Sequence, residues 1–129
     1  MFVFRETTPE RYAAMSADER RQALRNWNAW CDELATGGKL LHGSPLFPEG
    51  RVIGGSRRGS VIDGPFAEAK ELIGGYVIVT AADIDEATAL AERCPNIAYG
   101  MSIEIRPVAE ACHLARSLGL NTMREAASV

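Results

Sequence analysis

The stretch that decides the fold spans residues 63–79 and reads Asp63-Gly64-Pro65-Phe66-Ala67-Glu68-Ala69-Lys70-Glu71-Leu72-Ile73-Gly74-Gly75-Tyr76-Val77-Ile78-Val79. It opens as a turn, because Asp hydrogen-bonds nearby backbone readily while Gly and Pro supply special backbone geometry. A polar segment follows, and Gly74-Gly75 then allows close backbone approach or a β-bulge. Residues 72–81 are rich in β-branched and aromatic side chains, so this run is the clearest strand prediction in the chain.

Two helices are predicted from capping signals and apolar periodicity. Ser16 and Glu19 form a capping box, and the helix that follows should reach about residue 35, where Gly37-Gly38 ends it. Asp83, with Glu86 three residues later, opens a second helix that stops at Pro95. The apolar stripes contain Ala23, Leu24, Trp27, Trp30, Cys31 and Leu34 in the first helix, and Ile84, Ala87, Leu90, Ala91 and Cys94 in the second.

The other segments predict a mixed fold. Strands are expected over residues 2–5, 39–46, 51–53, 59–62 and 101–108, with residues 54–58 as a hairpin turn, and a tail helix over residues 111–118. Two amphipathic helices must then cover one face of one antiparallel sheet, which is the α+β, ferredoxin-like arrangement. The candidates for the core or an interface are Phe2, Phe4, Trp27, Trp30 and Tyr76.

Composition narrows the class of protein. The 129 residues suit one domain, and a net charge of -3 gives no electrostatic reason to expect nucleic acid. No apolar run is long enough to cross a bilayer, and the first residues lack the features of a signal peptide, so we expect a cytoplasmic protein. Cys31, Cys94 and Cys112 form no Cys-x-x-Cys pair, which favours reduced thiols.

Several motifs together resemble one known family. They are residues 63–68, Lys70-Glu71, Gly74-Gly75-Tyr76, Cys94-Pro95 and residues 102–108. With these motifs the chain resembles the DGPF branch of the YCII-related proteins over about residues 1–108, leaving residues 109–129 as a partly helical tail. The resemblance implies a homodimer, a dimeric α+β barrel in which two ferredoxin-like sheets face each other. It also implies an alternative role as a regulatory protein. DGPF-type members resemble proteins that are often encoded beside extracytoplasmic-function sigma factors.

The resemblance does not carry over a catalytic mechanism. Better-characterised relatives, one of them a dehydrochlorinase, have a His on the first helix and an Asp before a Pro-Phe after the second. Trp27 and Cys94 stand at those places here. An indole is not a base, and a thiol on an apolar face is poorly activated. A lyase or dehydrochlorinase-like enzyme would need His42 as the replacement base, so whether the protein is an enzyme stays open.

The last strand predicts a polar site. Because side chains alternate along a strand, Glu104 and Arg106 lie opposite the apolar Met101, Ile103 and Ile105. Arg5 and His42 join them if their strands have the matching register. This set, with Asp63 as a further candidate, suits a small polar or anionic molecule in the cleft between subunits, which is the preferred function. The structural alternatives are an Arg–carboxylate pair at the dimer seam, a packed His42, and an Asp63 that only stabilises its turn.

No cofactor or metal is predicted. Adjacent residues on a helix diverge, so Cys112 and His113 make a poor metal pair. The glycine-rich residues 54–59 lack the Lys-Ser/Thr ending of a P-loop and the spacing of a dinucleotide fingerprint. Ser56 does not fit a nucleophile elbow, because Arg58 stands where Gly is required.

Overall fold

The computed structural model describes residues 1–54, 61–63 and 72–124, and within these ranges it is an α+β fold. Four strands form an antiparallel sheet in the order β2-β5-β1-β6. With one helix after β1 and another after β5, this is the predicted ferredoxin-like arrangement. The elements are β1 (Phe2–Glu6), α1 (Glu10–Ala14), α2 (Ala17–Thr36), β2 (Leu40–Pro45), β3 (Arg51–Ile53), β4 (Val61–Asp63), β5 (Leu72–Val79), α3 (Ile84–Glu92), the 3-10 helix η1 (Pro95–Tyr99), β6 (Ser102–Ile105) and α4 (His113–Ser117).

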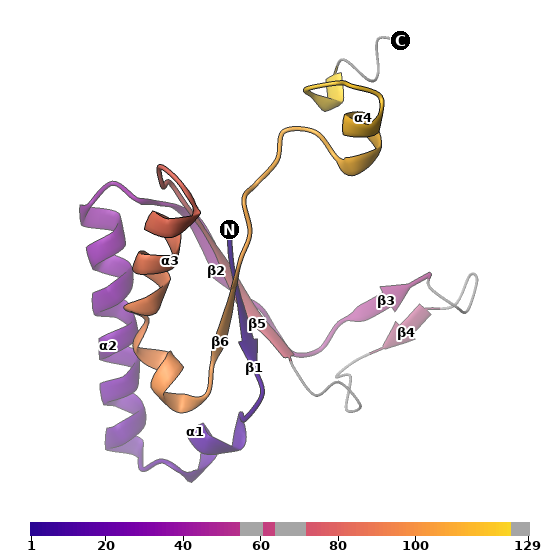
Figure 1. Ribbon diagram of the computed structural model, residues 1–129. Coiled ribbons are helices and arrows are strands. Elements are labelled where there is room, and N and C mark those ends of the chain that lie inside the picture. The colour runs from indigo at the N-terminus through magenta and orange to yellow at the C-terminus, as the bar shows by residue number, and fades with distance from the viewer. Residues whose placement is uncertain (55–60, 64–71, 125–129) are drawn as a thin grey trace.

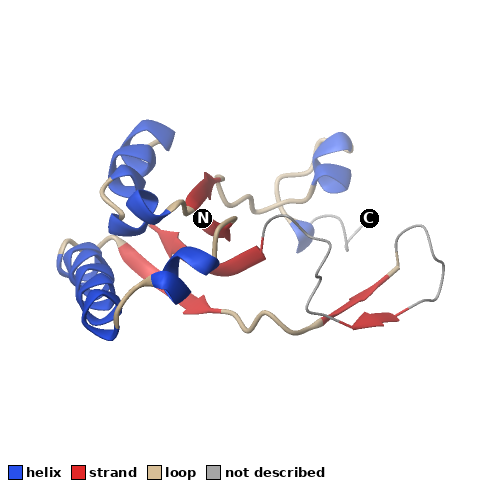
Figure 2. Ribbon diagram, turned by 90° about the horizontal axis from the view of Figure 1, so that it is seen from below, coloured by secondary structure: helices blue, strands red, loops and turns tan. Residues whose placement is uncertain are grey.

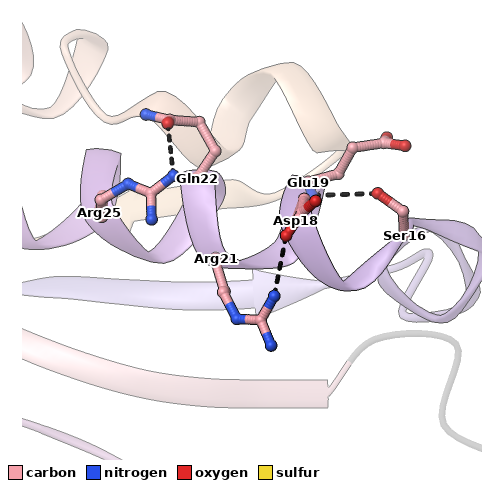
Figure 3. A network of polar contacts seen from close by, with 6 residues as sticks. All are labelled: Ser16, Asp18, Glu19, Arg21, Gln22 and Arg25. Carbon is pink, nitrogen blue, oxygen red and sulfur yellow. Dashed lines mark hydrogen bonds and ion pairs between the residues drawn. The ribbon is translucent and has the colours of Figure 1, made fainter.

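Both predicted helix caps form. The Ser16 hydroxyl accepts a hydrogen bond from the Glu19 backbone N–H at 3.1 Å, and the Asp83 carboxylate accepts one from the Glu86 backbone N–H at 2.8 Å. Figure 3 shows the first cap beside the polar outer surface of α2, where Arg21 donates to Asp18 at 2.8 Å. These contacts satisfy backbone groups that a helix start leaves without intrahelical partners, so local sequence fixes where α2 and α3 begin.

The core lies between the sheet and the helices α2 and α3, which run side by side on one face (Figure 1). Phe2, Phe4 and Trp30 are at most 4% exposed. The Trp30 indole N–H donates to the Leu90 carbonyl at 3.1 Å, which joins α2 to the end of α3. Cys94 is also buried here, as its place on an apolar stripe predicts.

Two stripe residues are exposed, and one helix was not predicted. Leu24 is 60% exposed and lines a pocket described below, and Ile84, the first residue of α3, is 52% exposed. Ala23, Trp30 and Leu34 form the narrower buried stripe of α2. The segment expected as a connector, residues 7–15, contains the short helix α1.

Gly74 and Gly75 form a β-bulge and a close backbone approach, as predicted, but they lie inside β5 and not before it. The β1–β5 register shifts between Phe4 and Arg5, which leaves Gly74 as the extra residue of a bulge. A Cβ atom on Gly75 would stand 2.7 Å from the carbonyl oxygen of Ser44. Asp63, predicted to open the turn, is instead the last residue of β4 and pairs with Arg51. The predictions for residues 64–71, the rest of the turn and the polar segment, lie outside the described residues.

The strands β3 and β4 form a separate two-stranded sheet, in which Arg51 pairs with Asp63. This pairing confirms the predicted hairpin strands, whose connecting residues 55–60 lie outside the described ranges. Figures 1 and 2 show this ribbon and α4 projecting on the side of the sheet away from α2 and α3. Across the described part of the chain, no helix has the length and apolar character needed to span a membrane.

Candidate functional site

The sheet face opposite α2 and α3, called the open face below, carries most of the predicted site residues. Since Phe2 and Phe4 pack on the helices, Val3 and Arg5 point to the open face. Val3 pairs with Glu104 across β1 and β6. Nη2 of Arg5 lies 3.5 Å from Oε1 of Glu104, and these side chains are 30% and 41% exposed. The structure therefore brings two of the predicted residues into one ion pair.

The other predicted site residues lie in other parts of the fold. Arg106 follows the end of β6, where its backbone N–H donates to the carbonyl oxygen of Met1 at 2.9 Å. His42 lies on the open face of β2, with Nδ1 2.9 Å from the hydroxyl of Tyr76. The strand β5 separates it from Arg5. Asp63 ends β4 in the other sheet. Within one chain, the His42–Tyr76 contact is thus separate from the Arg5–Glu104 ion pair.

A second feature lies on the helix side of the sheet. A pocket of about 680 Å³ lies between α2 and the strands β2 and β5, and it is called the α2 pocket below. Its size falls in the range of small-molecule sites. Its lining contains the apolar side chains of Phe4, Ala23, Leu24, Trp27, Leu40, Val77 and Met101, the small residues Gly43 and Gly75, and polar residues that include Glu6, Tyr12, Arg20 and Asn96.

Two glycines help to keep the pocket empty of side chains. A Cβ atom on Gly43 would stand 2.8 Å from Cγ2 of Val77, and one on Gly75 would meet the Ser44 carbonyl. The close approach of β2 and β5 therefore requires glycine at both positions. Because both glycines face α2, the helix covers backbone here instead of packed side chains, and a hollow remains beneath it.

The polar end of the α2 pocket consists of Glu6 from β1, Tyr12 from α1 and Asn96 from η1. The Tyr12 hydroxyl donates to Oε1 of Glu6 at 3.4 Å and accepts from Nδ2 of Asn96 at 3.3 Å. Oε2 of Glu6 and Oδ1 of Asn96 are buried and receive no hydrogen bond from the described residues. Most buried polar atoms have a partner, so two unpaired acceptors in one pocket lining are unusual.

Burial changes the acidity of these groups. Desolvation raises the pKa of Glu6, and the hydrogen bond from Tyr12 opposes that rise. Desolvation, followed by the charge of Glu6, raises the pKa of Tyr12 to about 12. Tyr12 therefore keeps its proton at neutral pH and acts as a donor toward Glu6.

Trp27 and Cys94 offer no acid–base pair in place of the one found in the relatives. Trp27 packs edge-on against Phe4, with ring centroids 5.0 Å apart, and lines the α2 pocket. Cys94 is 4% exposed, and burial raises the pKa of its thiol to about 11. The thiol therefore stays protonated and packs as an apolar group.

The described residues show neither a disulfide nor a metal cluster. Cys31, Cys94 and Cys112 are free thiols. Within residues 1–54, 61–63 and 72–124, no three His, Cys, Asp or Glu side chains gather closely enough to hold a metal ion.

Sequence reasoning missed the polar end of the pocket. One signal was present: in β1, Phe2, Phe4 and Glu6 alternate, which places a carboxylate on the core face. Tyr12 lies in a segment expected to be a connector, and Asn96 follows Pro95, the first residue of η1. Nothing in their local sequence indicates that these two side chains meet Glu6.

Comparison with known proteins gives one result for the whole fold. The family model described as the YCII-related domain matches residues 1–111. No curated protein matches the chain.

Proposed function

The chain belongs to the family of YCII-related domains, and on that premise we propose that it is a small-molecule-binding protein whose ligand occupies the α2 pocket. One observation carries the proposal. The hollow of about 680 Å³ combines a largely apolar wall with a polar end whose buried acceptors have no donor among the described residues. Ligand sites commonly combine apolar surface with a few convergent polar groups.

The burial pattern supports this assignment. Trp27, at the centre of α2, is only partly buried although it lies on the core side of the helix. Its ring contacts Phe4 and Trp30, and it also forms part of the pocket wall. An aromatic side chain in this position offers a large apolar surface to a ligand.

A thermal-shift screen with small aromatic and aliphatic fragments tests the proposal. Ala23 is buried and lines the pocket, so Ala23→Leu should fill part of the hollow and abolish stabilisation by the fragments. Ala29 is exposed on the same helix, so Ala29→Leu is the matched control and should keep the wild-type shifts. The proposal fails if no fragment stabilises the wild type, or if Ala23→Leu responds as the wild type does.

A second candidate is a small polar or anionic molecule in a cleft between two copies of the chain. The partly exposed Arg5–Glu104 ion pair on the open face favours it, because a ligand can reach both side chains. Phe47 and Ile53, near and in the projecting ribbon, are 89% and 75% exposed, and exposed apolar side chains of this size favour association with a second copy.

The open-face candidate has a separate test. In a thermal-shift screen of anionic metabolites, Arg106→Ala should lose the stabilisation seen in the wild type. Arg25→Ala is the control, because Arg25 lies on the outer surface of α2 (Figure 3). Equal shifts in wild type and Arg106→Ala would rule out this assignment.

An enzyme of the lyase type is favoured by one contact. The Tyr76 hydroxyl holds Nδ1 of His42 at 2.9 Å, which would orient the ring and leave Nε2 for substrate. Any lyase turnover should then vanish in His42→Gln, and activity retained in that variant would exclude the role. The DGPF-branch assignment and an association with a sigma factor stay predictions from the sequence.

A further inference from the structure

We propose that the ligand of the α2 pocket is an amphipathic primary amine, whose ammonium group is held by Glu6 and Asn96 while its hydrocarbon or aromatic body lies against the apolar wall. This inference rests on the proposed pocket function. It follows from which polar groups of Glu6, Tyr12 and Asn96 already have a hydrogen-bond partner and which have none.

Each donor atom at the polar end has a partner within the protein. The Tyr12 O–H donates to Oε1 of Glu6, and Nδ2 of Asn96 donates to the Tyr12 oxygen. Two acceptors remain, Oε2 of Glu6 and Oδ1 of Asn96, with no donor from the described residues. A partner that completes this set must therefore supply N–H or O–H groups.

Charge narrows the head group further. No Lys or Arg of the described residues forms an ion pair with Glu6 in the structure. A buried carboxylate without a cation is costly, and burial raises the pKa of Glu6 accordingly. An ammonium group offsets that cost and supplies three N–H donors, whereas a carboxylate ligand meets a like charge. The Glu6 end of the α2 pocket therefore favours a cationic head group, although the pocket lining also contains the cationic side chain of Arg20.

The two acceptor atoms are closed to solvent while the pocket is empty, so a side chain must rotate before either one meets a ligand. Both residues belong to the pocket lining. The last torsions of Glu and Asn side chains are soft, so either oxygen can turn toward a head group at small cost. The apolar wall, which includes Phe4, Trp27 and Met101, then takes the body of the ligand.

Calorimetric titration with three probes of similar shape tests the head group: 2-phenylethylamine, 2-phenylethanol and 3-phenylpropanoate. We expect wild type to bind the amine at least about tenfold more tightly than the carboxylate, a difference of about 1.4 kcal/mol, since the amine gains a charge-assisted hydrogen bond and the carboxylate meets a like charge. Glu6→Gln should lose that preference. Glu10→Gln, at an exposed position of α1, should keep it.

A second variant keeps the test decisive if Glu6→Gln folds poorly. Asn96→Leu should weaken the amine and the alcohol together, because both donate to the amide oxygen, and should leave the carboxylate unchanged. Equal binding of all three probes, or an amine preference that survives in both variants, overturns the inference and leaves the pocket function standing. Failure of the amine to bind wild type also overturns it, while the fragment screen with Ala23→Leu judges the pocket function independently.

Discussion

The hydroxyl of Tyr12 lies 3.4 Å from Oε1 of Glu6, and this contact joins α1 to the core-facing end of β1. It holds a carboxyl group at the end of an apolar pocket, where a charged group is poorly solvated. Such placements cost stability and commonly mark functional positions. The relationship between these two residues therefore has consequences for both stability and binding.

The pH dependence of stability should reveal the burial of Glu6. Its pKa in the folded state is raised above the unfolded value, so folding favours the protonated carboxyl. The destabilisation is absent at pH values below the unfolded pKa and grows as pH rises through the folded pKa. Glu6→Gln should consequently raise the melting temperature more at pH 7 than at pH 4, as measured by calorimetry. Glu10→Gln serves as the control, and an equal change at both pH values would contradict this reading.

The glycine pair in β5 should respond asymmetrically to alanine. A Cβ at Gly75 would lie 2.7 Å from a backbone oxygen of β2, whereas one at Gly74 meets only Cγ of Glu6, at 3.5 Å. Gly75→Ala should therefore destabilise the protein by about 1–3 kcal/mol, the usual cost of overpacking. Gly74→Ala should lie within about 0.5 kcal/mol of wild type. Urea unfolding of both variants measures the difference, and similar values for the two would show that β2 can move aside.

The cap of α2 is open to a simple test. Because the Ser16 hydroxyl accepts from the Glu19 N–H, Ser16→Ala should cost about 1 kcal/mol of unfolding free energy. Ser16→Asp retains a side-chain acceptor and should recover most of that loss. If Ser16→Ala unfolds at the wild-type denaturant midpoint, the cap contributes nothing to stability.

The three thiols should react in a fixed order. The backbone amides of Ala115 and Leu114 lower the pKa of the exposed Cys112 thiol, while burial raises the pKa of Cys31 and, to about 11, that of Cys94. Iodoacetamide labelling of the native protein near pH 8, followed by mass spectrometry, should find Cys112 modified first and Cys94 last. In denaturant the three rates should converge. Early modification of Cys94 in the native protein would contradict its burial.

Local sequence predicts the helices and strands of this fold better than it predicts the contacts between them. Ser16 and Asp83 act through residues three positions away, so the starts of α2 and α3 can be predicted from the chain alone. Strand alternation likewise places Glu104 on the open face. The partner of Glu104 depends on how β1 pairs with β6. The sequence could therefore predict the Arg5–Glu104 contact only if the register of these two strands matched.

The α2 pocket could not be predicted in the same way. It depends on the approach of β2 to β5 at Gly43 and Gly75, and on α1 and η1 reaching the same end of the sheet. These are contacts between segments far apart in sequence. Only the alternation that ends in Glu6 gave a local sign of the pocket, and its two polar neighbours gave none.

The most direct measurement for the central claim is fluorine NMR of protein labelled with 5-fluorotryptophan. Trp27 lines the α2 pocket, whereas Trp30 is buried in the core and lies outside the lining. A larger shift of the Trp27 resonance than of the Trp30 resonance therefore indicates binding in the pocket and not a change of the whole core. On titration with 2-phenylethylamine and 2-phenylethanol, the Trp27 resonance should shift with saturation in wild type and in Ala29→Leu, but not in Ala23→Leu. A Trp27 resonance that stays fixed in wild type, or that shifts equally in Ala23→Leu, would contradict a ligand site beneath α2.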